Sequence, residues 1–119
     1  MFSHKLTINA SVTFLPASEG GRLIPAHNSN SYRPHLVVGD INQRAPLVAD
    51  DGRTLLEDYL GVGFTGSGEA FNPGESRDVI LQLIYYPDVN YDRLESASTF
   101  TIREGERIIG FGRVTGRSF

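Results

Sequence analysis

The fold is decided by the alternating stretch Leu6-Thr7-Ile8-Asn9-Ala10-Ser11-Val12-Thr13-Phe14, in which every second residue is apolar. Successive side chains of a β-strand point to opposite faces, so a period of two predicts a strand with one buried face. Pro16 ends this strand because proline cannot donate to the sheet ladder. Glu19-Gly20-Gly21-Arg22 then gives the backbone the freedom for a turn. We therefore expect the chain to fold as a β protein.

Three further regions have strand-like apolar patterns bounded by glycine or proline: residues 33–38, 79–86 and 99–115. The second of them reads VILQLIYY, which is typical of a strand that is covered on both faces. In the third, Glu104-Gly105-Glu106 has the length of a hairpin turn between two strands. Gly110 and Gly112 lie in the returning strand and indicate a bulge or a close backbone approach, as happens where a sheet curls into a barrel.

Residues 46–74 carry a mixed pattern. Four apolar residues fall at helical spacing, which allows a helical turn or two before Gly61: Leu55, Leu56, Tyr59 and Leu60. Val62 and Phe64 then resume a strand-like alternation. Residues 61–74 contain five glycines and one proline, so we expect a loop with one short strand there.

The composition is that of one ordinary globular domain, which we expect to span residues 1–119. With 39% apolar and 21% charged residues, wholesale disorder is excluded. The absence of cysteine excludes thiol catalysis, disulfides and cysteine–zinc sites, and it suits the reducing cytoplasm, where we expect the protein. No apolar run approaches the roughly 20 residues that span a bilayer, so we expect no membrane association.

The net charge of −3 argues against binding to DNA or other nucleic acid through overall positive charge. Residues 1–39 carry three cations and one acid, residues 40–102 four cations and eleven acids, and residues 103–119 four cations and two acids. If the two ends of the chain fold side by side, a small basic area results on an acidic body. Ten of the eleven cations are arginine, which suits phosphate or carboxylate recognition but can equally reflect genome composition.

Motifs for catalysis, nucleotide binding and metal binding are missing from the sequence. The only lysine, Lys5, has no glycine-rich phosphate loop before it, so we expect no nucleotide. Gly66-Ser67-Gly68 is similar to the centre of a hydrolase elbow but has no strand-to-helix turn around it. His4, His27 and His35 are too scattered for a helical zinc pair. We therefore expect no enzyme, no catalytic residue, no metal and no cofactor.

Three motifs follow one another along the chain: Glu19-Gly20-Gly21-Arg22 with Pro25 and Tyr32-Arg33-Pro34; Asn72-Pro73-Gly74-Glu75; and Ile102-Arg103-Glu104-Gly105-Glu106-Arg107 with Ile109-Gly110-Phe111-Gly112-Arg113-Val114. In this order the motifs resemble the C-terminal domain of translation elongation factor Tu, over most of the chain from about residue 6 to residue 117. The resemblance implies a closed antiparallel β-barrel of six strands with one long central loop insertion near residues 48–68. It also agrees with the missing nucleotide motif, because the GTPase site of that family lies in a separate domain.

The resemblance further implies which residues contact RNA or a partner. His35 and Glu104 take the RNA-facing positions, and a carboxylate can accept a hydrogen bond from a ribose hydroxyl. Four arginines belong to the matching motifs and suit phosphate contacts: Arg22, Arg33, Arg103 and Arg107. Alternatively, Arg33 and Arg103 form internal salt bridges of the barrel, and the motif glycines serve only tight turns.

We therefore predict a non-catalytic binding module, a stand-alone protein resembling the factor's C-terminal domain. The acidic body favours a protein partner, and transfer RNA or a similarly structured RNA is the second candidate. We expect no DNA, no membrane and no nucleotide as a partner. The alternative prediction is a decoy or immunity-type protein that competes with elongation factor Tu for a toxin or another ligand.

Overall fold

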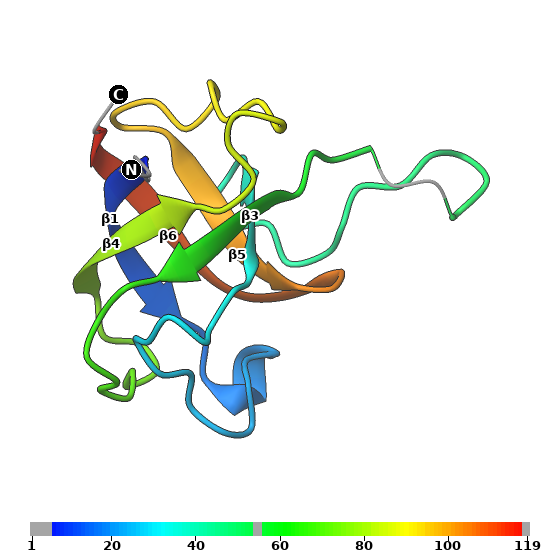
Figure 1. The fold of residues 1–119 in the computed structure, drawn as a ribbon. Coiled ribbons are helices and arrows are strands. Elements are labelled where there is room, and N and C mark those ends of the chain that lie inside the picture. Colours follow the sequence, from blue (N-terminus) through cyan, green and yellow to red (C-terminus); the bar gives the residue numbers. More distant parts are fainter. Residues whose placement is uncertain (1–5, 54–55, 118–119) are drawn as a thin grey trace.

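Six antiparallel strands close into a barrel in the computed structural model, which describes residues 6–53 and 56–117. The strands are β1 (Thr7–Phe14), β2 (His35–Val38), β3 (Leu60–Phe64), β4 (Arg77–Leu83), β5 (Thr99–Glu104) and β6 (Arg107–Arg117), and a short 3-10 helix, η1 (Ala17–Glu19), follows β1. Around the barrel their order is β1-β4-β3-β2-β5-β6 (Figure 1). The predicted all-β class and closed six-stranded barrel are confirmed.

The two ends of the chain lie side by side, because β1 pairs with β6 from Ile8 to Phe14. Gly110 and Gly112 make this pairing possible. A Cβ atom at Gly110 would lie 2.7 Å from the carbonyl oxygen of Thr13, and one at Gly112 would overlap the carbonyl of the facing strand. The close backbone approach predicted for these two glycines is therefore confirmed.

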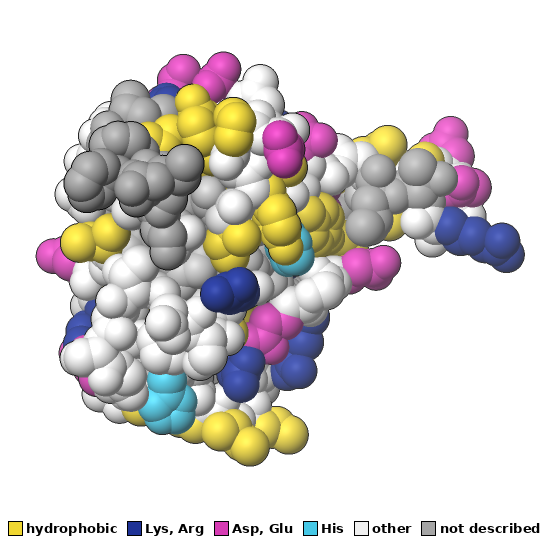
Figure 2. Space-filling view, viewed as in Figure 1, with side chains coloured by type: hydrophobic (Ala, Val, Ile, Leu, Met, Phe, Trp, Pro, Cys, Tyr) yellow, Lys and Arg dark blue, Asp and Glu magenta, His cyan; other side chains and the backbone are white. Residues whose placement is uncertain are grey.

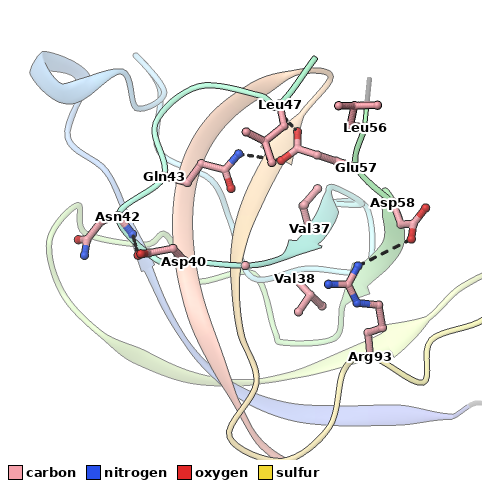
Figure 3. Close-up of a pocket in the computed structure, with 11 residues that line it drawn as sticks. Val37, Val38, Asp40, Asn42, Gln43, Leu47, Leu56, Glu57, Asp58 and Arg93 are labelled. Carbon is pink, nitrogen blue, oxygen red and sulfur yellow. Dashed lines mark hydrogen bonds and ion pairs between the residues drawn. The ribbon is translucent and has the colours of Figure 1, made fainter. Parts of the chain in front are cut away.

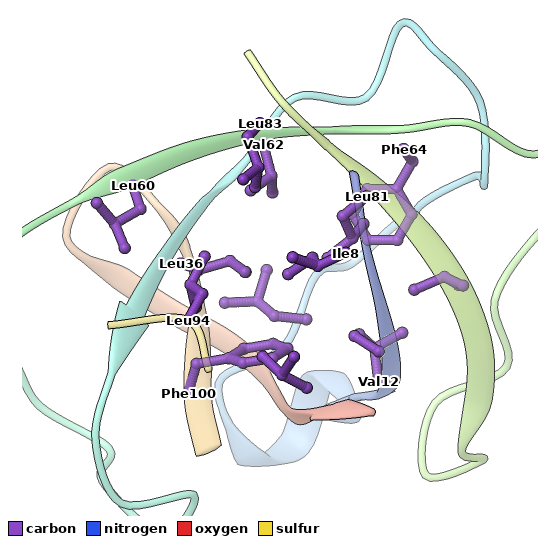
Figure 4. Close-up of a cluster of buried hydrophobic side chains, with 14 of the residues drawn as sticks. Ile8, Val12, Leu36, Leu60, Val62, Phe64, Leu81, Leu83, Leu94 and Phe100 are labelled. Carbon is purple, nitrogen blue, oxygen red and sulfur yellow. The ribbon is translucent and has the colours of Figure 1, made fainter. Parts of the chain in front are cut away.

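The barrel interior is filled by one cluster of apolar side chains (Figure 4). On β1 the inward-facing residues are Ile8, Ala10, Val12 and Phe14, which are all buried, whereas Asn9 is exposed. The alternation in the sequence thus becomes the inside and outside of the barrel wall. Other strands contribute side chains that are fully buried, among them Leu36, Val62, Leu81, Phe100 and Ile102.

The prediction that residues 79–86 form a strand covered on both faces is wrong. β4 ends at Leu83, and its buried side chains are Val79, Leu81 and Leu83. Ile80, which points to the other side, is 50% exposed. A barrel wall has a single apolar interior, so an apolar side chain that points outward meets solvent unless a loop covers it.

Between β2 and β3 the described residues 40–53 and 56–59 form a long arm that projects from the barrel (Figure 1). The predicted helical turn is absent from the described part of this segment, and Leu55 lies outside the described residues. The two sides of the arm are instead joined by a backbone hydrogen bond, in which the N–H of Leu56 donates to the carbonyl of Leu47 at 3.0 Å. The arm contains the first part of the predicted loop near residues 48–68, and β3 and the loop after it contain the rest.

Candidate functional site

The two end motifs meet at the turn between β5 and β6, next to the loop that follows η1. Arg22 forms an ion pair with Glu104, and the hydroxyl of Tyr32 donates to the same carboxylate oxygen at 2.7 Å. The guanidinium of Arg22 also lies over the ring of Tyr32, 5.4 Å from its centroid. Its hydrogen bond to Glu104 raises the pKa of Arg22, and burial together with the hydrogen bond to Glu104 raises the pKa of Tyr32. This cluster joins three chain segments.

Arg107 fixes the same loop from its other side. Its Nε donates to the carbonyl of Gly20 at 3.1 Å, and its Nη2 donates to the carbonyl of Gly21 at 2.6 Å. Gly20 has a φ of 95°, in the left-handed region that glycine adopts without strain. A Cβ at Gly21 would overlap the carbonyl of Leu15, so only glycine fits there. The loop therefore has a specified backbone and two arginine contacts that hold it.

Two large aliphatic residues stand at the end of this fixed loop. Leu23 is 87% exposed and Ile24 is 70% exposed. The Nε of Arg22 donates to the carbonyl of Ile24 at 2.9 Å, which ties this pair to the cluster around Glu104. We call Leu23 and Ile24 the aliphatic tip. Sequence analysis missed it, although two consecutive aliphatic residues between an arginine and a proline in a turn were a usable signal.

Arg103 has a different environment from the one predicted for a partner-binding residue. Its side chain is fully buried beneath the base of the arm and pairs with Glu57, whose side chain is only 4% exposed. Two parallel hydrogen bonds of 3.0 and 2.9 Å join the guanidinium to the carboxylate, and the hydroxyls of Tyr59 and Thr101 each lie 2.9 Å from it. Arg103 has no exposed surface, so its assignment as a partner-binding residue is corrected to an internal salt bridge.

Glu57 is held as a carboxylate by these contacts. Burial disfavours its charge, but hydrogen bonds from Arg103, from the side chain of Gln43 and from the N–H of Leu47 outweigh burial and lower the pKa of Glu57. Gln43 and Leu47 belong to the outgoing side of the arm, whereas Glu57 belongs to the returning side. The buried pair therefore fastens both sides of the arm to β5.

The remaining predicted residues lie on or beside β2. His35 is half-buried and pairs in register with Arg103, and its ring centroid is 6.1 Å from that of Tyr59. Arg33 is exposed, and its Nε donates to the carbonyl of Asn30 at 3.2 Å. The structure thus gathers Arg22, Glu104 and Arg107 in one cluster and places His35 beside the buried Arg103 in another, whereas Arg33 belongs to neither.

The motif arginines do not build a simple basic surface. Arg22 is matched by Glu104, Arg103 is buried with Glu57, and Arg107 donates to backbone carbonyls. On the face shown in Figure 2, cationic and acidic side chains are interspersed. The arrangement therefore uses guanidinium groups to fix loops rather than to gather positive charge.

The described residues supply no group of three metal-ligating side chains, and His4 lies outside them. Ser67, at the centre of the elbow-like motif, is an exposed loop residue whose hydroxyl contacts Glu69 at 3.4 Å. Within the described ranges there is also no helix of the length and apolarity that crossing a membrane requires. The chain matches no protein-family model. What the site offers chemically is a rigid apolar projection with charged neighbours, which suits binding.

Proposed function

We propose that this protein is a non-catalytic binding module that docks on a protein partner by inserting the aliphatic tip into an apolar pocket. The observation that carries the proposal is the exposure of Leu23 and Ile24 on a loop whose backbone is fixed by Arg22 and Arg107. A loop that is ordered before binding loses little conformational freedom on docking. Burial of each aliphatic side chain contributes about 1.5–3 kcal/mol.

A protein partner is favoured over transfer RNA by the distribution of charge. RNA binding depends on cations that are available to neutralise phosphates. Of the four motif arginines, Arg22 and Arg107 are engaged within the protein and Arg103 is buried, which leaves only Arg33 exposed, and the net charge is −3. We expect this interaction in the cytoplasm, because a chain without cysteine needs no oxidising compartment.

We further propose that the module is related to the C-terminal domain of elongation factor Tu. The support is that residues of two separated motifs, Arg22 with Tyr32 and Glu104 with Arg107, form one cluster on a closed six-stranded barrel. A relative of that domain without a GTPase site could act as a decoy, and the partner would then also bind the complete factor.

The test is capture of a partner on immobilised protein, comparing wild type with the double variant Leu23→Ser/Ile24→Ser. The matched control is Ile80→Ser, which removes an exposed aliphatic residue from the outer wall of β4. We expect the wild type and the control to retain the same protein, and the tip variant to lose it by at least about 100-fold in affinity, since two buried anchors are removed.

Two additions decide between the classes of partner. Capture that is abolished by ribonuclease, or unchanged in the tip variant, contradicts docking through the aliphatic tip. Addition of purified elongation factor Tu tests the decoy role. A decoy and the factor compete for the same protein, so the added factor should release the captured protein from the immobilised module. All variants are first checked for an unchanged unfolding midpoint, so that loss of capture cannot result from unfolding.

A further inference from the structure

A groove lies between the end of β2 and the arm, away from the aliphatic tip (Figure 3). It has a volume of ≈ 510 Å³, which is within the range of binding sites in proteins. Leu47 and Leu56 form one side of it and are 57% and 63% exposed. Val37 points toward these leucines, and Val38 points to the opposite side of the strand (Figure 3). Two aliphatic side chains thus stay open to solvent beside a strand.

The groove lies along the end of β2, where β3 no longer pairs with it. β2 pairs with β3 only at His35 and Leu36, because the chain before Leu60 turns away into the arm. The N–H of Gly39 donates to Thr99 of the β5 side. Hydrogen-bonding groups alternate along an antiparallel strand, so the N–H and C=O of Val38 point to the side of β3.

No backbone hydrogen bond joins Val38 to residues 56–59, the described segment that continues β3 on that side. An N–H and a C=O at a strand edge form a template for pairing with another extended backbone. The groove therefore combines an open donor and acceptor with an aliphatic wall, which are the two features that recognise a peptide strand.

We propose that this groove binds a short extended peptide segment of a partner protein, antiparallel to β2, with valine-like side chains against Leu47 and Leu56 and a cationic residue at its N-terminal end. When the peptide runs antiparallel to β2, its residue facing Val38 comes two residues after its residue facing Asp40. Side chains alternate, so the residues on either side of the Val38-facing position point toward the arm.

Charge complementarity selects the cationic residue. Among the described residues Asp40 forms no ion pair, and its carboxylate accepts only from the N–H of Asn42, at 2.7 Å. At the far end of the groove Asp58 is already matched by Arg93, at 3.8 Å (Figure 3). Glu57 is matched by Arg103. An arginine facing Asp40 would complete the one unmatched charge of the groove.

The probe is the peptide acetyl-Arg-Val-Thr-Val-amide carrying a fluorophore, which stops before Leu36 because Leu36 is already paired with Leu60 of β3. It is titrated with the full-length protein by fluorescence anisotropy. We expect saturable binding, weakened at least about 10-fold when both valines of the peptide are replaced by serine. Methylation of the threonine N–H, which faces Val38, should weaken binding to a similar extent. Saturation with the unmodified peptide should slow hydrogen exchange at the amide of Val38.

Matched protein variants keep the proposal testable. Asp40→Asn retains the oxygen that accepts from Asn42 and removes only the charge, so it should weaken the arginine peptide several-fold and leave a citrulline peptide unchanged. Leu47→Ser/Leu56→Ser should abolish binding without unfolding, because both side chains are exposed. Leu23→Ser/Ile24→Ser should bind the peptide normally, which separates this proposal from the proposed function.

Several results would overturn the groove proposal. No saturable binding up to about 1 mM peptide excludes it as a site of useful affinity. Equal binding of the arginine and citrulline peptides to wild type rules out the charge argument, and an indifferent response to N-methylation rules out strand pairing. A dimer that forms in sedimentation experiments and is lost in Leu47→Ser/Leu56→Ser would assign the groove to a second copy of the chain instead.

Discussion

Two arginine–glutamate pairs fasten two loops to the same barrel, and they differ mainly in burial. In the pair of Arg22 with Glu104, about a third of each side chain is exposed. In the pair of Arg103 with Glu57, the two side chains are 0% and 4% exposed. A partly exposed pair is screened by water and contributes little to global stability, whereas a buried pair is costly to break. The same chemistry thus sets a local loop geometry at one site and supports the barrel wall at the other.

The largest effect is expected when the buried pair loses one member. Arg103→Met keeps most of the side-chain volume but leaves the carboxylate of Glu57 buried without its cation. We expect a loss of about 3–5 kcal/mol in the free energy of unfolding. Urea denaturation at pH 7, followed by circular dichroism, measures it. The contrast between the two pairs would be lost if Arg103→Met and Arg22→Met cost the same.

The double variant Arg103→Met/Glu57→Met is the control for this experiment. It removes both charges and replaces them with apolar side chains, so no buried charge is left unmatched. Because such replacements are often neutral or stabilising, most of the stability lost in Arg103→Met should return. A double variant as unstable as the single one would mean that the arm needs the hydrogen bonds themselves.

The barrel strands were predictable because their signals are local. The alternation from Leu6 to Phe14 and the hairpin turn at Gly105 each depend on neighbouring residues, and both appear in the structure. The partner of Arg103 was not predictable in the same way. Glu57 lies 46 residues earlier in the sequence, in a segment with a misleading helical spacing, and only the closed topology brings the two together.

The candidate site was predicted only in part for a related reason. Arg22, Glu104 and Arg107 were identified from motifs, and they do converge because β1 pairs with β6. The sequence pattern could not tell whether their guanidinium groups face solvent or the protein's own carbonyls. The exposed groups that the structure adds, Leu23 and Leu56, are aliphatic, and exposure of an aliphatic residue depends on the surrounding loops.

The second effect concerns the pH dependence of the buried pair. The folded protein holds the pKa of Glu57 below its ordinary value of 4.5. Ionised Glu57 therefore contributes stability at pH values above about 4.5, and this contribution is lost as the pH falls through the lower folded-state pKa. Glu57→Gln removes the titrating group, and it should cost about 1.5–3 kcal/mol at pH 7.

Denaturation of wild type and Glu57→Gln across the acidic range isolates this contribution from that of other carboxylates. The difference between their free energies of unfolding should be largest near neutral pH and should shrink as the pH falls below 4.5. A difference that stays constant over this range would show that the charge of Glu57 adds nothing beyond its hydrogen bonds.

The smallest effect on stability is expected at the partly exposed pair of Arg22 with Glu104, where the consequence is local. Arg22→Met removes the ion pair with Glu104 and the hydrogen bond to the carbonyl of Ile24, and should cost no more than about 1 kcal/mol. Arg107 still holds Gly20 and Gly21, so the barrel should unfold as before. Amide hydrogen exchange in the loop from residue 22 to residue 24 should nevertheless accelerate, since opening there no longer breaks these contacts. If exchange in the loop stays unchanged, Arg107 and the backbone geometry of Gly20 and Gly21 alone hold the aliphatic tip. A partner-binding defect in Arg22→Met would then indicate that the guanidinium contacts the partner directly.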